Sequence, residues 1–417
     1  MTMPRLRFKA EDGSTFTVWD NKVLSEVASM HARIGWQNLR TDEFLDSGDY
    51  LLITGTDFQN GIVNYNTCHY VDQWRYDQDL KIQVRNGTVL VTKDGTLGKV
   101  AIVKDLPKPA TLNAGVFAIN PLQGSKLLQE YLYYWLSAPM LMHYARAMSS
   151  GGTIKHLNQS ILVNFPIKVP CIEEQRKIAD LLLAVDEVIA KQQAEVTAWK
   201  LRKKGVAQRL FSQEVRFKAD DGSDFPEWSL IHLAEIGRLQ SGYTFSPKYQ
   251  GHHDKPIDVY KVADMNLAKN SKEMMLANNT IDTAIASLMS ARPITEPSII
   301  FAKVGEAIRS ERRRIARKPF ITDNNMMAFI PSPNYHFGFC YWLLQSIPFA
   351  PHAQSGSPPS LTATIINDLT AEIPSSIEEQ RKIADCLDAF DDVIAKAKTE
   401  LELWRELKRG LLQQLFV

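Results

Sequence analysis

Nine residues of this chain are written twice. The phrase IEEQRKIAD occupies residues 172–180 and recurs letter for letter at residues 377–385. Aligned at this offset of 205 and continued without a gap, residues 172–211 and 377–416 share 23 identities in 40 positions. A match of this length constrains the fold strongly, because both copies must suit the same local structure.

A second repeated segment precedes the variable part of each half. RFKAEDGSTFTVW at residues 7–19 matches RFKADDGSDFPEW at residues 216–228 at nine of 13 positions. Two matched segments in the same order indicate an internal duplication, so the chain must fold into two related halves.

Between the matched segments the two halves diverge, but weak parallels keep their order. VLVTKDG at 89–95 resembles IIFAKVG at 299–305, and AINP at 118–121 resembles AFIP at 328–331. The letters YWL also occur in both halves, at 134–136 and at 341–343. We therefore expect two variable domains that share a fold and differ in their surfaces.

The variable domains show signals of both strands and helices. YLLITGTD, KIQVRNGTVLVTKDG and KVAIV are typical of short strands bounded by Asn-Gly, Asp-Gly and other glycine turns. KLLQEYLYYWLSAPMLMHYARAM is typical of a helix. We expect two similar α+β domains.

The matched 40-residue segments predict two long helices. Apolar residues recur at alternating steps of four and three, which is the spacing of a coiled-coil seam, and no Pro or Gly interrupts either segment until Gly205 and Gly410. Each helix could instead pack on the core of its own domain. We favour pairing between the helices because the stripe is narrow, and the predicted pairing residues are Ile178, Leu182, Val185, Ile189 and Trp199 in the first helix and Ile383, Leu387, Phe390, Ile394 and Trp404 in the second.

Connectivity predicts the direction of that pairing. The first helix leaves domain one and ends at domain two, so an antiparallel second helix would return the C-terminus to the neighbourhood of residue 1. A helix of 39 residues extends roughly 58 Å at about 1.5 Å per residue. We predict a pseudo-two-fold arrangement with these parts: a first variable domain at 1–170, a first helix at 171–214, a second variable domain at 215–374 and a second helix at 375–417.

Composition excludes several classes of protein. Lys plus Arg number 48 against 47 Asp plus Glu, a balance that argues mildly against a chain that grips DNA unaided. No stretch approaches the roughly 18 apolar residues of a membrane span and no signal peptide is evident, so we expect a cytoplasmic protein. The four cysteines lack Cys-x-x-Cys spacing, which predicts buried free thiols and neither disulfides nor a zinc site.

A search for catalytic motifs gives no usable candidate. NFPI at 164–167 departs from the Asn-Pro-Pro-aromatic loop of amino-methyltransferases at its second and fourth positions, and GTLGK at 95–99 lacks the spacing of a phosphate loop. The His residues show no metal-ligand spacing. We therefore expect a chain without an active site or a metal site of its own.

Basic clusters are more informative about binding. RSERRRIARK at 309–318 concentrates arginines beside a glycine turn, and SSGGTIKHLNQS at 149–160 carries polar groups of the kind found at nucleic-acid backbones and base edges. A solvated face and ordinary turn chemistry are the alternatives. The predicted DNA contacts are Lys93, Thr96, Lys99, Lys155, His156 and Asn158 in the first half and Lys303, Arg309, Arg312, Arg313 and Arg314 in the second.

The openings of the two long helices carry a family resemblance. VPCIEEQRKIADLL and IPSSIEEQRKIADCL, each following a divergent domain, resemble the specificity subunit of type I restriction and modification enzymes. GDYLLITGTDFQNG and VLVTKDGTLGKVAIV also look like segments of the target-recognition domains of this family. The resemblance covers nearly the whole chain in its organisation.

The resemblance implies a non-catalytic reader of double-stranded DNA. Each target-recognition domain would recognise one half of a two-part asymmetric site, and the paired helices would fix the gap and dock two methyltransferase subunits. Restriction subunits would join the full complex. S-adenosylmethionine, ATP and Mg²⁺ would be bound by these partners and none by this chain. The alternative is a coiled-coil interaction scaffold whose variable domains bind protein or RNA.

Overall fold

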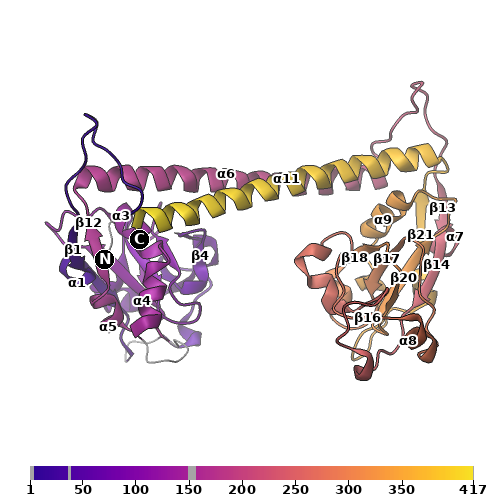
Figure 1. Cartoon of the computed structure of the whole chain (residues 1–417), viewed down its shortest axis with the longest axis horizontal. Helices are drawn as coiled ribbons and strands as arrows, with labels where there is room; N and C mark the ends of the chain where they lie inside the picture. Colours follow the sequence, from indigo (N-terminus) through magenta and orange to yellow (C-terminus); the bar gives the residue numbers. More distant parts are fainter. Residues whose placement is uncertain (1–3, 36–38, 149–155, 417) are drawn as a thin grey trace. The chain divides into compact units, whose positions relative to one another are not determined.

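The computed structural model describes residues 4–35, 39–148 and 156–416. The chain divides into two compact units. Unit 1 comprises residues 1–195 and 397–417, and unit 2 comprises residues 196–396. Each unit therefore contains a variable domain, the start of one long helix and the end of the other (Figure 1).

Two helices of 40 residues each confirm the prediction from the repeat. They are α6, Ile172–Phe211, and α11, Ile377–Phe416. Both begin at the Ile of the repeated phrase, where two glutamates occupy the first turn. Acidic side chains are stabilising there because the helix dipole is positive at its N-terminus.

The helices pair antiparallel, as predicted. In unit 1 the Lys408 ammonium lies 2.5 Å from a carboxylate oxygen of Asp186, and in unit 2 Lys203 lies 2.5 Å from Asp391. Lys203 and Lys408 are equivalent positions of the repeat, and so are Asp186 and Asp391. In each unit the lysine comes from the end of one helix and the aspartate from the start of the other. Lys203 and Lys408 lie one step of four residues after Trp199 and Trp404, so they continue the seam, and each is paired with a carboxylate of the opposite helix.

The predicted seam residues contact more than the opposite helix. Ile178 and Leu182 are fully buried in a core that also contains the domain's own strands and the end of α11, and Ile383 and Leu387 lie in the corresponding core of unit 2. At its start, each helix therefore packs both on its own domain and on the opposite helix, so both arrangements considered from the sequence occur. Further along the seam, Val185, Ile189 and Ile394 are buried, Trp404 is half-buried, and the rings of Trp199 and Phe390 are 6.1 Å apart.

Unit 1 contains three sheets in its described residues. An antiparallel pair joins the two ends of the variable domain: β1 Asp20–Val23 and β12 Pro166–Val169. A four-stranded sheet has the order β6 His69–Val71, β3 Tyr50–Ile53, β10 Ala110–Leu112 and β7 Gln83–Val84. A six-stranded sheet has the order β2 Ala28–Ala32, β11 Val116–Pro121, β8 Val89–Thr92, β9 Val100–Ile102, β5 Ile62–Val63 and β4 Phe58–Gln59.

Unit 2 repeats this plan with fewer strands. Its terminal pair is β13 Ser229–His232 with β21 Thr370–Ile373. The larger sheet has the order β14 Gly237–Ser241, β20 Met326–Pro331, β17 Ser298–Ala302 and β18 Arg313–Ala316. The smaller sheet has the order β16 Thr280–Ile281, β15 Ile257–Tyr260 and β19 Phe320–Thr322.

Short helices complete both domains. Those of unit 1 are α1 Leu24–Val27, α2 Gln73–Asp77, α3 Gln129–Ser137, α4 Met140–Met148 and α5 Gln159–Val163. Those of unit 2 are α7 Leu233–Ile236, α8 Thr283–Leu288, α9 Phe337–Ser346 and α10 Ala363–Asp368. No helix in the described ranges is long and apolar enough to cross a membrane.

Most of the weak parallels between the halves occupy equivalent places. Ala118 and Ala328 pair with corresponding residues of β8 and β17. The shared letters YWL are the exception. The ring that faces the seam lysine is Tyr134 in unit 1 and Trp342 in unit 2, so the two YWL segments are out of register by one residue. The ring that lies against the seam lysine, and not the shared letters, shows which residues of the two helices are equivalent.

A buried carboxylate joins each long helix to the segment that precedes its domain. Glu174 is fully buried, and its two oxygens accept hydrogen bonds from Arg7 at 2.8 and 3.0 Å and from the Trp19 indole at 2.7 Å. The hydrogen bond to this carboxylate raises the pKa of Arg7. The second Glu of the repeated phrase is therefore a structural residue.

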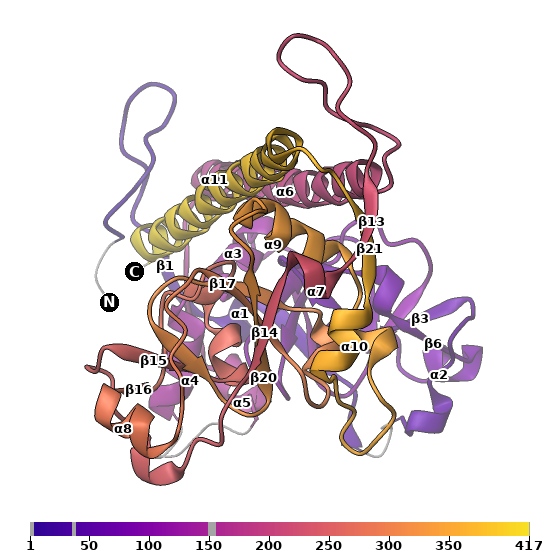
Figure 2. The ribbon, with the colours of Figure 1, turned by 90° about the vertical axis from the view of Figure 1, so that its right-hand side faces the viewer.

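Unit 2 builds the same joint from its own copy of the residues. Glu379 is fully buried and accepts hydrogen bonds from Arg216 at 3.0 Å and from Trp228 at 3.1 Å. The loops between the joined residues, 9–15 and 218–224, rise above the long helices of their own units, on the side away from the variable domain (Figure 1 and Figure 2). The RFKA segment occurs twice because its arginine, Arg7 or Arg216, binds the buried glutamate at the start of each long helix.

The C-terminus lies beside the start of the chain, as predicted. The backbone N–H of Leu6 donates to the carbonyl oxygen of Gln414 at 3.1 Å, and the N–H of Val215 donates to Arg209 at 3.1 Å. Gln414 and Arg209 are equivalent positions of the repeat. The start of the chain therefore contacts the end of α11 in the way that residue 215 contacts the end of α6.

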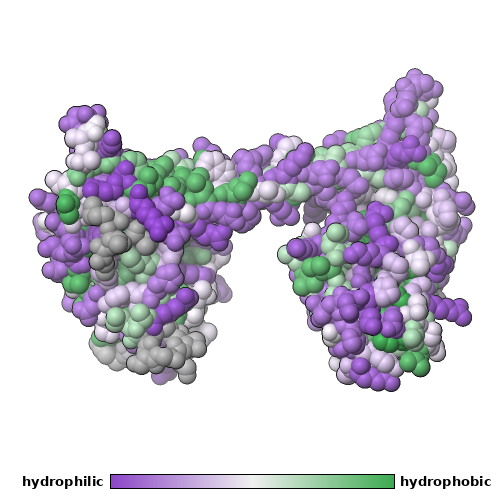
Figure 3. All heavy atoms as spheres, viewed as in Figure 1, coloured by the Kyte–Doolittle hydropathy of each residue, from purple (hydrophilic) through white to green (hydrophobic). Residues whose placement is uncertain are grey.

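The surface is mostly hydrophilic, but hydrophobic residues gather over the part of α11 that belongs to unit 1 (Figure 3). Leu403 and Leu407 are exposed there.

All four cysteines are free, as predicted, but the prediction that all are buried is wrong. Cys68 and Cys340 are buried, Cys386 is half-buried, and Cys171 is exposed immediately before α6. Burial raises the pKa of Cys68 and of Cys340 to about 12.

We expect Glu174→Gln to destabilise unit 1 by about 3 kcal/mol, because it leaves a partly buried arginine without its counter-charge. For a unit of this size the melting temperature should fall by roughly 6–12 °C. Differential scanning calorimetry of the full chain measures this fall, and hydrogen exchange should rise in residues 5–19. The matched control is Glu173→Gln, because Glu173 is exposed in the same helix turn. Equal effects of the two substitutions would contradict the assigned role.

We expect Cys171 to react first with a disulfide reagent at pH 8. With a pKa of about 12, Cys68 and Cys340 hold roughly one thiolate in ten thousand at that pH. Mass spectrometry of the modified peptides identifies the reactive thiol. Cys171→Ser should remove the fast phase, and a fast phase that persists in this variant would show that Cys386 or a buried cysteine reacts as readily.

Candidate DNA interface

Each variable domain has a hollow where the turn after its central strand meets a loop that precedes its last short helix. In unit 1 the turn follows β8 and the loop leads into α5, and in unit 2 the turn follows β17 and the loop leads into α10. The residues predicted to contact DNA belong largely to these segments. The repeat therefore places the same kind of surface on both domains.

Backbone hydrogen bonds fix the hollow of unit 1. The N–H of Lys93 donates to Gly115 at 2.9 Å, and its carbonyl oxygen accepts from Leu157 at 2.9 Å. The Lys93 side chain is half-buried, with its ammonium 5.6 Å from the Phe117 ring. The hollow has a volume of about 420 Å³, and its polar lining includes Lys93, His156 and Asn158.

One contact between side chains spans this hollow. Nδ1 of His156 lies 2.5 Å from a carboxylate oxygen of Asp94, and both side chains are substantially exposed. An imidazole held this way at the surface can present its other ring nitrogen to a base edge or a phosphate.

The turn between β8 and β9 is tightly held. The Thr92 hydroxyl donates to the Thr96 carbonyl at 2.5 Å and accepts the Lys99 N–H at 2.9 Å. Gly98 has a φ of +70°, and a Cβ there would lie 2.2 Å from the Met142 sulfur. Thr96 and Lys99 are thus exposed on a rigid turn, which is how a contact residue is best presented.

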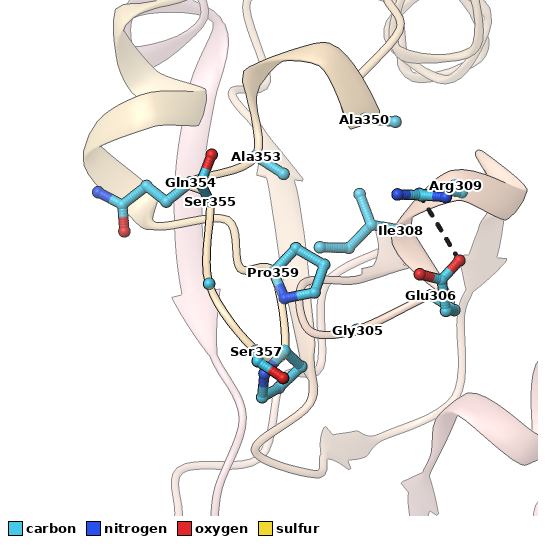
Figure 4. A pocket seen from close by; sticks show the side chains of 12 residues that line it. Gly305, Glu306, Ile308, Arg309, Ala350, Ala353, Gln354, Ser355, Ser357 and Pro359 are labelled. Carbon is cyan, nitrogen blue, oxygen red and sulfur yellow. Dashed lines mark ion pairs between the residues drawn. The ribbon is translucent and has the colours of Figure 1, made fainter.

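Unit 2 fixes its hollow with the same backbone bonds. The N–H of Lys303 donates to Asn325 at 2.8 Å, and its carbonyl oxygen accepts from Leu361 at 2.8 Å. The N–H of Gly305 also donates to Pro359 at 2.8 Å. This hollow measures about 600 Å³ and is lined by residues 353–359 (Figure 4).

The charged side chains of this hollow differ from those of unit 1. Figure 4 shows Glu306 and Arg309 on one side of the hollow, facing the loop of residues 353–359. Nε of Arg309 lies 3.6 Å from the Glu306 carboxylate, and both side chains are largely exposed. Water competes for such a pair, so Arg309 is available to a phosphate or a guanine edge.

Arg313 must be withdrawn from the predicted DNA contacts. Its side chain is 1 % exposed, and it donates to the carbonyl oxygen of Ile347 and to the Glu311 carboxylate, with the Phe349 ring 4.0 Å away. Burial lowers its pKa. Arg313 lies in β18 with its side chain inward, so it supports the domain.

The neighbouring arginines are divided between structure and surface. Arg314 is half-buried and donates to the carbonyl oxygen of Asn270 at 2.5 Å. Arg312 is exposed and contacts Asn266. Arginines that are adjacent in the sequence thus point in different directions, because successive side chains of a strand lie on opposite faces.

The remaining predicted contacts lie at or near the hollows. Lys93, His156 and Asn158 line the hollow of unit 1, and Arg309 lines that of unit 2. Thr96, Lys99 and Lys303 belong to the turns beside the hollows and are not among their lining residues, and Lys155 lies outside the described residues.

Arg33, which the sequence leaves equally compatible with structure or readout, lines the hollow of unit 1, where it is 1 % exposed and donates to Leu112 at 2.9 Å, and burial lowers its pKa. The loop 353–359 of unit 2 was missed from the sequence. Its Ser-Gly pair followed by a Leu matches the spacing of Ser150, Gly151 and Leu157 to within one residue, which was the available signal.

No group of His, Cys, Asp or Glu in the described parts of the chain has the arrangement of a metal site.

Comparisons with known proteins agree with this organisation. The family described as type I restriction modification DNA specificity domain matches residues 18–198 and 226–403. The MjaIX specificity subunit of a type I restriction enzyme from Methanocaldococcus jannaschii is 26% identical over 348 residues, which cover 79% of this chain and 76% of that protein.

Solved structures share the fold. The S subunit of a type I restriction-modification system from M. genitalium matches with a TM-score of 0.53 and 18% identity, covering 100% of this chain and 99% of that one. A chain from a study of complex assembly in the type I system matches with a TM-score of 0.60 and 14% identity, covering 96% and 97%. With two family matches that span most of its length, the chain belongs to the type I restriction-modification DNA specificity family.

Proposed function

We propose that this chain is the non-catalytic DNA reader of its complex, in which each variable domain recognises one half of a two-part asymmetric site. The observation that carries the proposal is a hollow at the end of the central strand in each domain, next to a lysine that is held by the same backbone bonds. The backbone bonds of Lys93 and Lys303 are the same, whereas the polar side chains are Asp94 and His156 in one hollow and Glu306 and Arg309 in the other. One framework with two different linings suits two different half-sites.

The long helices would carry the partners and set the gap. Two methyltransferase subunits would dock on this chain and supply adenine methylation with S-adenosylmethionine, and restriction subunits using ATP and Mg²⁺ would join them. Support comes from the uninterrupted length of α6 and α11 and from relatives named as specificity subunits. Membership of this family disfavours a general scaffold that binds protein or RNA.

Exchanging residues 20–169 for the matching segment of another specificity protein should change one half of the recognised DNA and leave the other half unchanged. The exchange keeps Trp19 and Glu174 in place and moves both strands of the β1–β12 pair together, so the joint survives. Selection from a random duplex library measures both halves. A change in both halves, or in neither, would rule out one domain per half-site.

Arg309→Glu should weaken duplex binding at least tenfold in about 0.1 M salt. The loss of one phosphate contact should also reduce the slope of log affinity against log salt by about 0.9. Lys318→Glu makes the same change of charge sign at an exposed residue outside the hollow and should cost threefold or less. Fluorescence anisotropy at several salt concentrations measures both, and equal losses would mean that only net charge matters.

A further inference from the structure

A pocket in unit 1 is lined by residues of α3, of the turn that joins β4 to β5, and of α6. Its volume is about 260 Å³, and its apolar lining includes Ile62, Ile102, Tyr133, Leu183 and Ile189. At roughly 30 Å³ per water molecule, it has room for one long side chain.

The equivalent place in unit 2 is filled by the chain itself. The N–H of Ile102 donates to the carbonyl oxygen of Gly61 at 2.9 Å, and the N–H of Ile315 donates to Lys272 at 2.9 Å. Ile102 and Ile315 hold the same position in their sheets. Lys272 is therefore the structural counterpart of Gly61, and its side chain occupies the space that is open in unit 1.

Aromatic rings and carboxylates hold the Lys272 ammonium. It lies 2.8 Å from Asp388 and 3.1 Å from Asp391, and 5.0 Å from the centroid of the Trp342 ring. Although burial opposes the charge, the hydrogen bond to Asp388 and the charge of Asp391 raise the pKa of Lys272. This site stabilises a cation on a long apolar stem.

Unit 1 has counterparts of most residues around Lys272, but it has no counterpart of the lysine side chain itself. Tyr134 and Asp186 replace Trp342 and Asp391, and Leu183 stands where unit 2 has Asp388. Asp186 pairs with Lys408 through one oxygen and accepts the Tyr134 hydroxyl at 2.9 Å through the other, whereas the two oxygens of Asp391 pair with Lys203 and Lys272.

The chain cannot fill the unit 1 pocket from its own turn. Gly61 has a φ of +80°, and a Cβ there would lie 2.0 Å from the Tyr133 hydroxyl oxygen. The charged residues of the lining are Glu130, Asp186 and Glu187 against Lys104, so the lining is acidic on balance. An occupant with an apolar stem and a positive end fits both the apolar and the acidic residues of the lining.

We propose that this pocket of unit 1 receives an arginine or lysine side chain from a partner protein, in the place that Lys272 fills in unit 2. The two halves of the duplication would then differ in how they engage partners, with one closed site and one open one. The identity of the partner as a methyltransferase subunit rests on the proposed function, whereas the chemistry of the pocket does not.

Methyl NMR of the full-length chain labelled at isoleucine tests the pocket chemistry. Nα-acetyl-arginine amide and Nα-acetyl-lysine amide should shift the signals of Ile62, Ile102 and Ile189, and the better of the two should bind at least tenfold more tightly than neutral Nα-acetyl-norleucine amide. The counterparts Ile315 and Ile394 should not respond. Equal binding of the neutral probe, or no response at the three isoleucines, would overturn the proposal.

Opening the counterpart site gives a matched test. Lys272→Ala should make Ile315 and Ile394 respond to the cationic probes as well, while Lys203 still pairs with Asp391. Glu187→Lys should weaken binding in unit 1 at least fivefold. No new response in the opened site would contradict the assignment, and the wild-type titration decides independently of whether this variant folds.

Association with the methyltransferase subunit tests the docking role. Glu187→Lys should weaken assembly about tenfold, and Asp392→Lys, at the equivalent exposed position of α11, should change it twofold or less. Equal assembly of both variants would overturn the docking role and leave the proposed function intact. Failure of the unaltered chain to bind any methyltransferase would count against both.

Discussion

The rest of the structure depends on a buried carboxylate at the start of each long helix. Glu174 holds Arg7 and Trp19, and Glu379 holds the equivalent residues of the second half. A buried carboxylate is stable only when its oxygens are paired, so helix start and preceding segment must be retained together. The end of the opposite helix completes each core, because Phe416 packs 5.5 Å from Tyr131. The domain between can vary while this joint stays.

The two halves differ mainly in the parts of the variable domains that do not contact the buried carboxylate joint. Backbone hydrogen bonds keep Lys93 and Lys303 in the same place, and those bonds do not depend on side-chain identity. The neighbouring side chains are free to differ, and they do. The same division occurs on the helices, where a seam built from equivalent residues lies beside a pocket that only one half fills. The family to which the chain belongs pairs two target domains, and this arrangement gives each a distinct surface.

Sequence periodicity predicted the two long, repeated helices. It did not predict features that depend on the orientation of one strand or the burial of one ring. The seam from Ile178 and Ile383 was readable because 40 residues keep one spacing. Arg313 was misjudged because a run of arginines does not show that β18 turns every second side chain inward. The YWL match misled by one residue because burial, which sets the register, is invisible in the letters. The correspondence of Gly61 with Lys272 has no sequence signal and needed the backbone bonds to reveal it.

The central claim is that two domains read two different halves of one DNA site. The most direct measurement is to produce the unaltered chain with a methyltransferase partner and map methylated adenines across the host genome by single-molecule sequencing. The account predicts one motif with two specified blocks, separated by a gap of fixed length and not complementary to each other. A single continuous block, or a palindromic site, would contradict it.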